Sequence, residues 1–292
     1  MQLTGTAWFL ILAVPRIIYA QTKEANGSSQ PVVCDCGFKD ESNNIWANIW
    51  HADYSVYNSN LRQDSHYMLM DYTVDPKHNN TFSRVFTPNN VRLSADNGIV
   101  LSVEKDSNGK YSSASIGTKR DDFLYGTFRA KLKTSNVPGT VAAFFYYRNN
   151  TSEIDVEMLS RLNDPYMSYF SVQPQVYESN GQASPLTNNK HPLSYNPTED
   201  YHTYRFDWTP GSVKFYVDDE FVNELTTNIP NSPGRILLNH WTDGNPNFSG
   251  GPPTETAELT LSKLNIFFNS SESDNSLQCQ HSKSACLVSG KE

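Results

Sequence analysis

Three carboxylates recur at every second position of one short segment: Glu153, Asp155 and Glu157. Successive side chains of a β-strand point to opposite faces, so this spacing predicts a strand with all three acids on one face. The apolar residues between them, Ile154 and Val156, would then enter a core. Three acids this close cannot all ionise cheaply, so we expect at least one to hold its proton near neutral pH. Such a row can place an ionised nucleophile beside a protonated acid.

The spacing of Glu153 and Glu157 fits glycoside chemistry. Their Cα atoms would lie about 13 Å apart at about 3.3 Å per residue, and side chains that lean toward each other would bring the carboxyl groups to about 5–6 Å. Retaining glycosidases separate their two carboxyl groups by about 5–5.5 Å, and inverting ones by more. An exposed strand whose acids are merely solvated is the alternative, and three acids alone leave it open.

The composition limits the classes of protein. The chain has 292 residues, of which 12% are aromatic and 18% charged, and this suits a large β-rich fold. The length exceeds that of an average domain, yet β-sandwiches of about 200–250 residues form single domains. The formal charge is −8, and nucleic-acid phosphates repel an acidic surface, so we expect no nucleic-acid partner. A neutral polymer is the better fit.

The N-terminus predicts export. Residues 8–20 are mostly apolar, too short to span a bilayer, and end in a small residue, which indicates a signal peptide over residues 1–20. A polar, flexible lead-in over residues 21–37 follows. Six Asn-x-Ser/Thr sequons agree with a secreted glycoprotein, either extracellular or associated with a cell wall: Asn26, Asn79, Asn149, Asn150, Asn247 and Asn269.

The four cysteines lie near the two ends of the chain: Cys34, Cys36, Cys279 and Cys286. Four cysteines allow three pairings, and in an oxidising compartment we expect disulfides that tie down the termini. A metal site is the alternative, but the spacers between the cysteines do not fit the usual ligand spacing, so we expect no metal. No hydrophobic tail follows the last apolar run at 258–268, so no membrane or lipid anchor is indicated.

Short apolar or alternating runs between turn residues make up most of the chain, as in an all-β sandwich. The clearest strands are residues 82–86, 99–104, 126–133, 140–147, 168–173, 202–208, 212–217, 235–241 and 259–268. No helical periodicity, βαβ rhythm or internal repeat appears. We expect the Pro-rich loops 180–200 and 244–253 to border a binding site, and the polar tail 270–292 to lie outside the core.

Five segments together resemble glycoside hydrolase family 16, and most closely its fungal lichenase-like and laminarinase-like β-glucanases: GTFRAKLK at 126–133, VAAFFYY at 141–147, EIDVE at 153–157, HTYRFDWTPGSVKFYV at 202–217 and LNHWTDG at 238–244. The resemblance runs over residues 38–269, which we expect to form one catalytic domain. It implies a β-jelly roll of two curved antiparallel sheets, concanavalin A-like, with a β-glucan cleft on the concave face. It also implies Glu153 as nucleophile, Glu157 as acid/base and Asp155 as the residue that tunes them. We expect no cofactor and a monomeric chain.

Six residues near the acids are candidates for substrate binding: Phe145, Tyr147, Tyr169, Gln173, Asn239 and Trp241. Phe145 and Tyr147 share one face of residues 141–147, and the resemblance favours that face for stacking on glucose rings. Tyr169 and Gln173 likewise share a face of the strand after the acids, and Asn239 and Trp241 share the face opposite His240. A Trp on a sandwich strand is more often core, but the resemblance favours a sugar platform for Trp241.

The chain departs from the family's pattern at three positions. Thr151 stands where lichenases carry a Trp, and Val172 stands where related fungal sequences show an Asn before Gln-Pro. Arg129 replaces a Glu that some bacterial lichenases place in the cleft. These differences leave the linkage preference open.

The leading hypothesis is a secreted endo-β-glucanase that hydrolyses β-1,3 or mixed β-1,3/1,4 glucans of cell walls with retention. A cell-wall transglycosylase is the first alternative, because a sugar can capture the retained intermediate as readily as water. A non-catalytic, lectin-like carbohydrate-binding protein is an alternative of another class, and it would need no row of acids. We interpret His202, Asp207 and Trp208 as structural residues.

Overall fold

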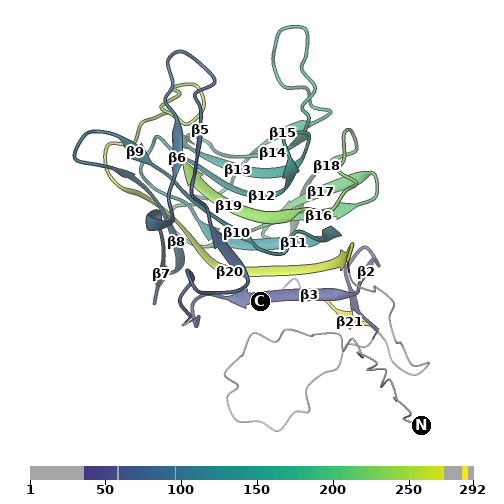
Figure 1. Cartoon of the computed structure of the whole chain (residues 1–292). Helices are drawn as coiled ribbons and strands as arrows, with labels where there is room; N and C mark the ends of the chain where they lie inside the picture. Colours follow the sequence, from purple (N-terminus) through teal and green to yellow (C-terminus); the bar gives the residue numbers. More distant parts are fainter. Residues whose placement is uncertain (1–35, 58, 96, 273–284, 289–292) are drawn as a thin grey trace, which may run out of the picture.

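The computed structural model describes residues 36–57, 59–95, 97–272 and 285–288. Two large sheets of seven and nine strands pack face to face, and Figure 1 shows them as two curved layers. The helix content of the described residues is one short 3-10 turn, η1 (Pro88–Asn90). A helix long and apolar enough to span a membrane is not found in these residues. The predicted all-β jelly-roll sandwich is confirmed.

The seven-stranded sheet carries the acids. Its strand order is β15-β14-β13-β12-β19-β10-β4. The bounds are β4 Tyr67–Leu69, β10 Ala114–Thr118, β12 Val141–Asn149, β13 Ser152–Asn163, β14 Tyr166–Gln173, β15 Asn188–Pro192 and β19 Arg235–Trp241. The acid-bearing strand β13 pairs antiparallel with β12 on one side and β14 on the other, so both neighbours fix its register.

The nine-stranded sheet forms the outer layer. Its main order is β18-β17-β16-β11-β20-β8-β7, with β3 paired to β20 and β9 paired to β8. The bounds are β3 Asn48–Asp53, β7 Val91–Ser94, β8 Gly98–Lys105, β9 Tyr111–Ser112, β11 Phe123–Lys133, β16 His202–Thr209, β17 Ser212–Val217, β18 Glu220–Leu225 and β20 Ala257–Ser270.

All nine strands predicted from the sequence occur, most of them within two residues of the predicted bounds. The sequence missed several shorter strands, among them β15, which lies inside the segment 180–200 that was expected to be a loop. The β15 sequence NNKHP has no apolar alternation. It joins the sheet at the edge through backbone pairing with β14, and such pairing leaves no hydrophobic pattern in the sequence.

Alternation along the strands decides which side chains fill the space between the sheets. Ile154 and Val156 on β13 and Phe144 on β12 are fully buried there. Phe206 and Trp208 meet them from the outer sheet, with the ring centroids of Phe144 and Phe206 5.3 Å apart. Each such side chain contributes about 1.5–3 kcal/mol by leaving water. The indole N–H of Trp208 donates to the Pro230 carbonyl oxygen at 2.8 Å, which fits its structural interpretation.

A small three-stranded sheet has β1 (Phe38–Lys39) between β2 (Ile45–Trp46) and β21 (Cys286–Leu287). It contacts the nine-stranded sheet through Phe38, whose ring centroid lies 5.3 Å from that of Phe267 on β20. Strand β21 comes from the tail that the sequence left outside the core. Neither of the described cysteines, Cys36 and Cys286, is free.

The other two cysteines, Cys34 and Cys279, lie outside the described residues, as do the predicted signal peptide, the lead-in up to residue 35 and most of the tail. The pairing of the four cysteines therefore stays a prediction.

Arg129 lies on the outer sheet and not in the cleft. It sits on β11 directly opposite Arg205 on β16. Glu41 lies 3.7 Å from Nη2 of Arg129 and 2.9 Å from Nη2 of Arg205, and Asp207 lies 2.7 Å from the same Arg205 nitrogen. The comparison of Arg129 with a cleft glutamate is therefore wrong, because β11 belongs to the layer behind the acids.

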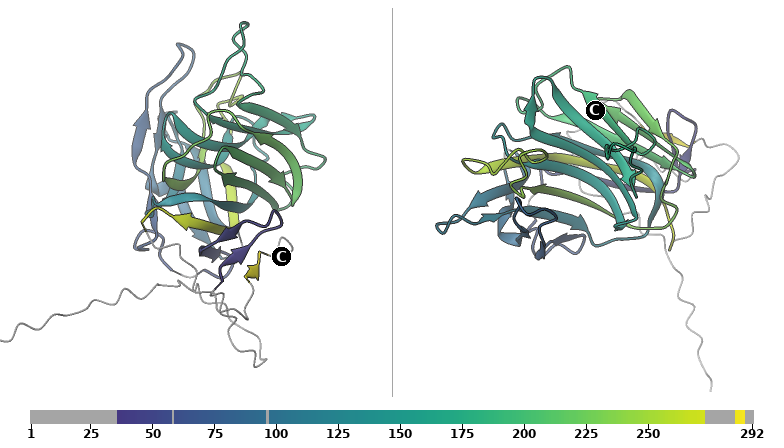
Figure 2. Two further views of the ribbon diagram at one scale, coloured as in Figure 1. Left: turned by 90° about the vertical axis from the view of Figure 1, so that its right-hand side faces the viewer. Right: turned by 90° about the horizontal axis from the view of Figure 1, so that it is seen from above.

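A hairpin of β5 (Tyr72–Val74) and β6 (Arg84–Phe86) forms a two-stranded sheet of its own. Figures 1 and 2 show it rising beside the seven-stranded sheet. Phe82 lies in the connection between the two strands, where its ring stacks on Tyr111 with centroids 5.5 Å apart and its N–H donates to the Asp243 carbonyl oxygen at 2.9 Å. Gly244 has φ +72°, and a Cβ there would lie 2.4 Å from the Phe82 ring. A glycine is therefore required at this contact.

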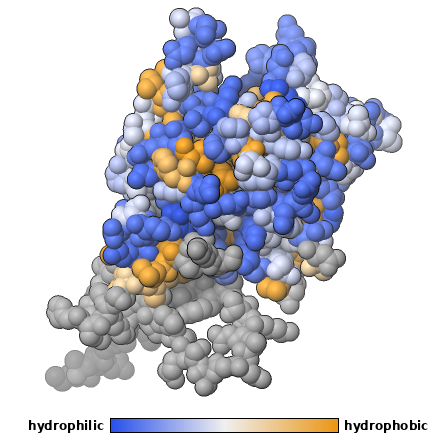
Figure 3. Space-filling model, turned by 180° about the vertical axis from the view of Figure 1, so that it is seen from behind, coloured by the Kyte–Doolittle hydropathy of each residue, from blue (hydrophilic) through white to orange (hydrophobic). Residues whose placement is uncertain are grey.

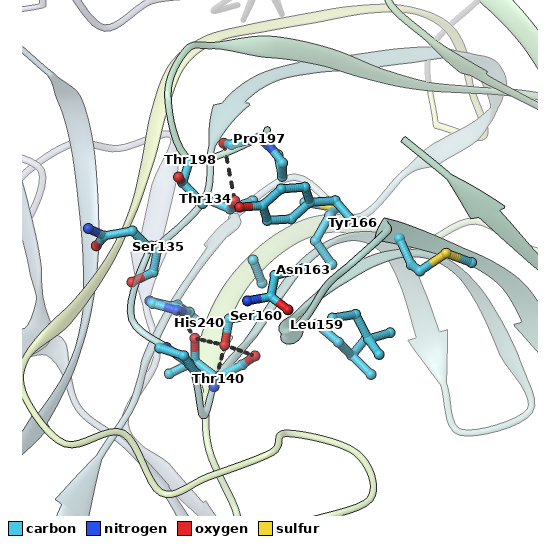
Figure 4. A pocket seen from close by; sticks show the side chains of 16 residues that line it. Thr134, Ser135, Thr140, Leu159, Ser160, Asn163, Tyr166, Pro197, Thr198 and His240 are labelled. Atoms are coloured by element: carbon cyan, nitrogen blue, oxygen red, sulfur yellow. Dashed lines mark hydrogen bonds between the residues drawn. The ribbon is translucent and has the colours of Figure 1, made fainter. Parts of the chain in front are cut away.

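A buried histidine links the two sheets. His240 on β19 is fully buried, with Nδ1 2.9 Å from the Leu101 carbonyl oxygen on β8 and Nε2 2.8 Å from the Thr140 hydroxyl oxygen. Figure 4 shows this network at the wall of a cavity of about 70 Å³, with Ser160 completing it through Thr140. The cavity contains none of the three acids.

This network predicts a loss of stability in acid. Burial lowers the pKa of His240 to about 4. Between pH 6.5 and 4, His240 is therefore protonated in the unfolded chain but neutral in the folded chain. Stability is then full above pH 6.5 and falls by up to about 3 kcal/mol as the pH drops toward 4. We expect His240→Gln to be less stable than the wild type at pH 7 and to lose less stability on acidification. Urea unfolding at pH 7 and pH 4.5 measures the free energy of unfolding of both proteins. An equal loss of this free energy in the variant and in the wild type would contradict the prediction.

Candidate active site

The structure brings the three acids together on the face of the seven-stranded sheet that points away from the core. The directly opposite pairs are Glu153 with Tyr147 and Gln173, Asp155 with Phe145 and Ser171, and Glu157 with Ala143 and Tyr169. This face follows from period two, because the alternate residues Ile154, Val156 and Met158 are all buried between the sheets. The merely solvated strand considered above does not describe this row, since Asp155 is only 7% exposed.

Two protrusions stand at the ends of these strands. One is the β5–β6 hairpin, and the other is the segment that joins β14 to β15. The space-filling view in Figure 3 shows two mostly hydrophilic protrusions with a hollow between them. The open direction of the hollow therefore crosses the strands, from β14 over β13 and β12 to β19. A polymer chain bound there would pass over the row of acids.

Asp155 is the best anchored of the three acids. The Ser171 hydroxyl donates to its Oδ2 at 3.0 Å, and the Gln173 amide nitrogen donates to the same oxygen at 3.3 Å. A hydrogen bond also joins the carboxyl groups of Asp155 and Glu153. These contacts hold Asp155 in one orientation against Glu153, so the two acids can share a proton.

Burial raises the pKa of every acid in the row. It raises the pKa of Asp155 to about 6, with the hydrogen bonds from Glu153, Ser171 and Gln173 opposing the rise. Burial and then the Asp155 charge raise the pKa of Glu157 to about 8. The same two causes raise the pKa of Glu153 well above its usual range. Because the three groups interact strongly, they titrate as a unit, and at neutral pH the row carries fewer than three charges.

The raised pKa of Glu157 predicts a stability gain on neutralisation. A carboxyl whose folded pKa lies above its unfolded value costs stability as the pH rises from about 4.5 to about 8, because the folded chain must give up a proton that it holds tightly. We expect Glu157→Gln to raise the free energy of unfolding at pH 8 by about 1–3 kcal/mol, and the gain to vanish near pH 4. Urea unfolding at both pH values measures it.

Glu104→Gln is the matched control for this experiment, because Glu104 is exposed and lies on β8 of the outer sheet. We expect no change in the control. A Glu157→Gln variant that is less stable than the wild type at pH 8 would show that the carboxylate is held by favourable contacts.

The predicted aromatic residues of β12 lie on the acid face. Phe145 and Tyr147 pack there against Leu237 and Met70, apart from the main core, with their own ring centroids 6.3 Å apart. Phe145 is 6% exposed and forms a floor, whereas Tyr147 is half-buried. Tyr147 is therefore the more accessible of the two rings for a sugar.

Asn239 and Trp241 also share the acid face, as predicted, but Trp241 is covered. Its ring is 6% exposed. The Arg84 guanidinium lies over the ring at 4.5 Å from the centroid, and Phe248 packs nearly parallel to it at 5.9 Å. The hairpin and the β19–β20 loop cover the Trp241 ring in this structure, and its role as a sugar platform stays a prediction. Asn239 Oδ1 is buried and has no hydrogen-bond partner in the described part of the chain.

Two departures from the family pattern lie away from the acids. Val172 is fully buried in the core between the sheets, so an amide at this position would not point toward the row. Its neighbour Gln173 does face the row and contacts Asp155. Thr151 is exposed in the turn between β12 and β13 and contacts Asn149. Val172 therefore takes no polar contact away from the row of acids, and Thr151 places no aromatic ring at the turn between β12 and β13.

Sequence reasoning missed Lys77 and Arg84 of the hairpin segment. The Arg84 and Lys77 charges both act to lower the pKa of Glu157, and Lys77 does the same for Glu153. No motif marks residues 72–86, so only the three-dimensional position of the hairpin identifies them. Among the described residues, no group of three His, Cys, Asp or Glu side chains could hold a metal ion.

A family model described as glycosyl hydrolases family 16 matches residues 78–260, more than half of the chain and all of the acid face described above. The chain belongs to glycosyl hydrolases family 16. Within this family, a beta-glucanase of Bacillus licheniformis is 31% identical over 170 residues, which cover 56% of this chain and 65% of that protein. A beta-glucanase of Paenibacillus polymyxa is 30% identical over 167 residues, covering 55% of this chain and 65% of that protein. The chain therefore matches just under two thirds of the length of these relatives.

Solved structures agree on the family 16 fold. The Bacillus licheniformis beta-glucanase superposes with a TM-score of 0.60 at 23% identity, covering 76% of this chain and 98% of that one. A Crh5 transglycosylase in its apo form superposes with a TM-score of 0.55 at 20% identity, covering 75% of this chain and 84% of that one. At these identities the likeness concerns the fold.

Proposed function

We propose that this family 16 chain is a retaining endo-β-glucanase that hydrolyses β-1,3 or mixed β-1,3/1,4 glucans. The observation that carries the proposal is the row of half-buried Glu153, buried Asp155 and half-buried Glu157 on one sheet face, in a hollow that crosses the strands. Beta-glucanase relatives at about 30% identity support a β-glucan substrate. An open hollow suits attack within a polymer chain, and not at its end.

The proposed reaction has two steps. Glu153 attacks the anomeric carbon of the bound glucan, while Glu157 gives its proton to the glycosidic oxygen, so that this C–O bond breaks and a glycosyl-enzyme ester forms. Glu157, now a carboxylate, then takes a proton from water, and the water oxygen attacks the same carbon and releases Glu153. Two inversions give net retention.

Asp155 has a proposed role in holding the proton that Glu153 must lose. Attack needs the negative charge on Glu153, whereas its strongly raised pKa beside Asp155 favours the shared proton on Glu153 at rest. The proposed role of Asp155 is to take this proton when the bound glucan draws the charge to Glu153. The raised pKa of Glu157, about 8, keeps that group protonated at neutral pH, as a general acid requires.

A polysaccharide panel tests the proposal. Purified protein is incubated with laminarin, lichenan, xyloglucan and chitin, reducing ends are counted, and the anomer of the first product is followed by proton NMR. Internal cleavage of laminarin or lichenan with a β-anomer formed first is the expected result. An α-anomer would contradict retention. Binding of a glucan without any product would favour the lectin-like alternative.

A transglycosylase is the second candidate, supported by the shared fold with a transglycosylase and by the retained intermediate that a sugar could capture. Adding a short labelled oligosaccharide to the panel separates the two activities. Labelled products longer than the acceptor indicate transfer, and only shortened chains indicate hydrolysis.

We further propose that the protein is secreted as a disulfide-bonded glycoprotein that acts outside the cell or at a cell wall, on the basis of the N-terminal segment, the sequons and the cysteines described above. Secreted material should begin near Gln21, lose mass when glycans are removed, and expose no free thiol on denaturation. Four titratable thiols in the secreted protein would contradict the disulfides.

A further inference from the structure

The β5–β6 hairpin brings a cation into the hollow. Arg84 at the start of β6 lies with its guanidinium carbon 4.5 Å from the centre of the Trp241 ring. Trp241 lies directly opposite Val141 on β12, and Val141 lies opposite Leu159 on β13, two residues from Glu157 and on the same face. Two strand spacings separate β19 from β13, about 10 Å. A chain that crosses the strands from Glu157 over Ala143 to Asn239 therefore runs beside Trp241, which is the next residue after Asn239 on the same face of β19, and beside the Arg84 guanidinium that lies over it.

The Arg84 guanidinium has no hydrogen bond or ion pair within the part of the chain that the structure describes. This differs from Arg129 and Arg205 on the outer sheet, which both lie near Glu41. A guanidinium carries five N–H donors in one plane. Stacking on Trp241 uses the face of that plane, so the N–H groups at its edge stay free to donate.

We propose that Arg84 is a substrate-binding residue of the hairpin that determines which glucans are accepted, donating hydrogen bonds to hydroxyl groups of the chain beside Glu157. This inference rests on the proposed function. The covered Trp241 then acts as the support that fixes the guanidinium, and the sugar meets the arginine and not the indole. Because hydroxyl positions differ between linkages, a fixed planar donor discriminates among glucans that a flat aromatic surface would accept alike.

The charge of Arg84 supplies a second, independent readout. The neighbours of Glu157 are Asp155 on its own strand, Tyr169 on β14 and Ala143 on β12. The positive charges that act on Glu157 come from Arg84 and Lys77 of the hairpin segment. Among the opposing effects on the pKa of Glu157, the Arg84 charge is the first of those that lower it. Removing this charge lets Glu157 keep its proton to higher pH, so the basic limb of the activity profile moves upward.

Two variants separate the hydrogen bonds of Arg84 from its charge. Arg84→Gln removes both, so on the glucan cleaved fastest by the wild type we expect KM to rise about tenfold or more, with an upward shift of the basic limb of kcat/KM. Arg84→Lys keeps the charge but loses the planar fork, so KM rises while the basic limb stays in place. The ratio of activities on laminarin and lichenan should change in both variants.

Arg92→Gln is the matched control, because Arg92 lies on β7 of the outer sheet and pairs there with Glu258 at 2.7 Å. The control should keep the wild-type KM, linkage ratio and pH profile. Thermal unfolding of each variant checks the fold, and if Arg84→Gln is unfolded, Arg84→Lys still tests binding.

Affinity distinguishes a failure of this inference from a failure of the proposed function. Calorimetric binding of the same oligosaccharides to Glu153→Gln, with and without Arg84→Gln, needs no turnover. Weaker binding in the double variant supports Arg84 as a contact even if the wild type cleaves nothing. Folded Arg84 variants with wild-type KM, affinity and pH profile overturn the inference, and a chain that neither binds nor cleaves any glucan overturns both.

Discussion

Replacing Glu153 by Gln is expected to lower turnover by about a thousandfold or more while glucan binding is largely kept. The amide has nearly the shape of the acid, so the surface beside the opposite residues Tyr147 and Gln173 is preserved. It cannot attack the anomeric carbon, so no glycosyl-enzyme forms. Turnover is measured by reducing ends, and binding by calorimetry with an oligosaccharide.

Glu104→Gln on the outer sheet provides the control for Glu153→Gln and should keep full activity. A mass spectrum of wild-type protein trapped with a fluorinated, activated glycoside should carry one sugar on Glu153, and the variant should carry none. Full activity in Glu153→Gln would show that Glu153 is not the nucleophile.

The acid face could be predicted from the sequence because period two is a strictly local property. Once residues 152–158 form a strand, the buried positions of Ile154 and Val156 oblige Glu153, Asp155 and Glu157 to point the other way. The same logic predicted the shared faces of Phe145 with Tyr147 and of Asn239 with Trp241. Register with β12 and β14 then placed these faces side by side.

The cover over this face could not be predicted in the same way. Arg84 reaches Trp241 across more than 150 positions of sequence, from a hairpin held in place by the contact of Phe82 with Gly244. Periodicity within a strand contains no information about a partner that distant. Arg129 was misplaced for a related reason, since its face was predictable but the layer to which β11 belongs was not.

The site is built at a cost in stability that the rest of the fold offsets. Three carboxyl groups with raised pKa values oppose folding as the pH rises, and buried His240 opposes it as the pH falls. We infer a stability maximum between these two effects, near neutral to mildly acidic pH. The proposed chemistry needs the same range, because the row must there hold one charge and at least one proton.

Replacing Glu157 by Ala is expected to slow cleavage of an unactivated glucan by about a hundredfold to ten-thousandfold, because no group then protonates the leaving oxygen. An aryl glucoside with a good leaving group needs that proton less, so its first step should survive in this variant and the glycosyl-enzyme should accumulate. Azide needs no general base, and its small anion fits the space that the missing side chain leaves. Added azide should therefore restore turnover.

The configuration of the azide product decides the roles of the two acids. Azide that attacks the glycosyl-enzyme of Glu157→Ala inverts the carbon a second time and gives a β-glycosyl azide. In the matched variant Glu153→Ala, azide can only attack the substrate directly, and this single inversion gives an α-glycosyl azide. An α-product from Glu157→Ala together with a β-product from Glu153→Ala would reverse the two assignments. Glu153 and Glu157 lie on one strand face with Asp155 between them, so their positions alone do not say which is the nucleophile and which is the acid/base. The stereochemistry of the rescued product assigns these two roles.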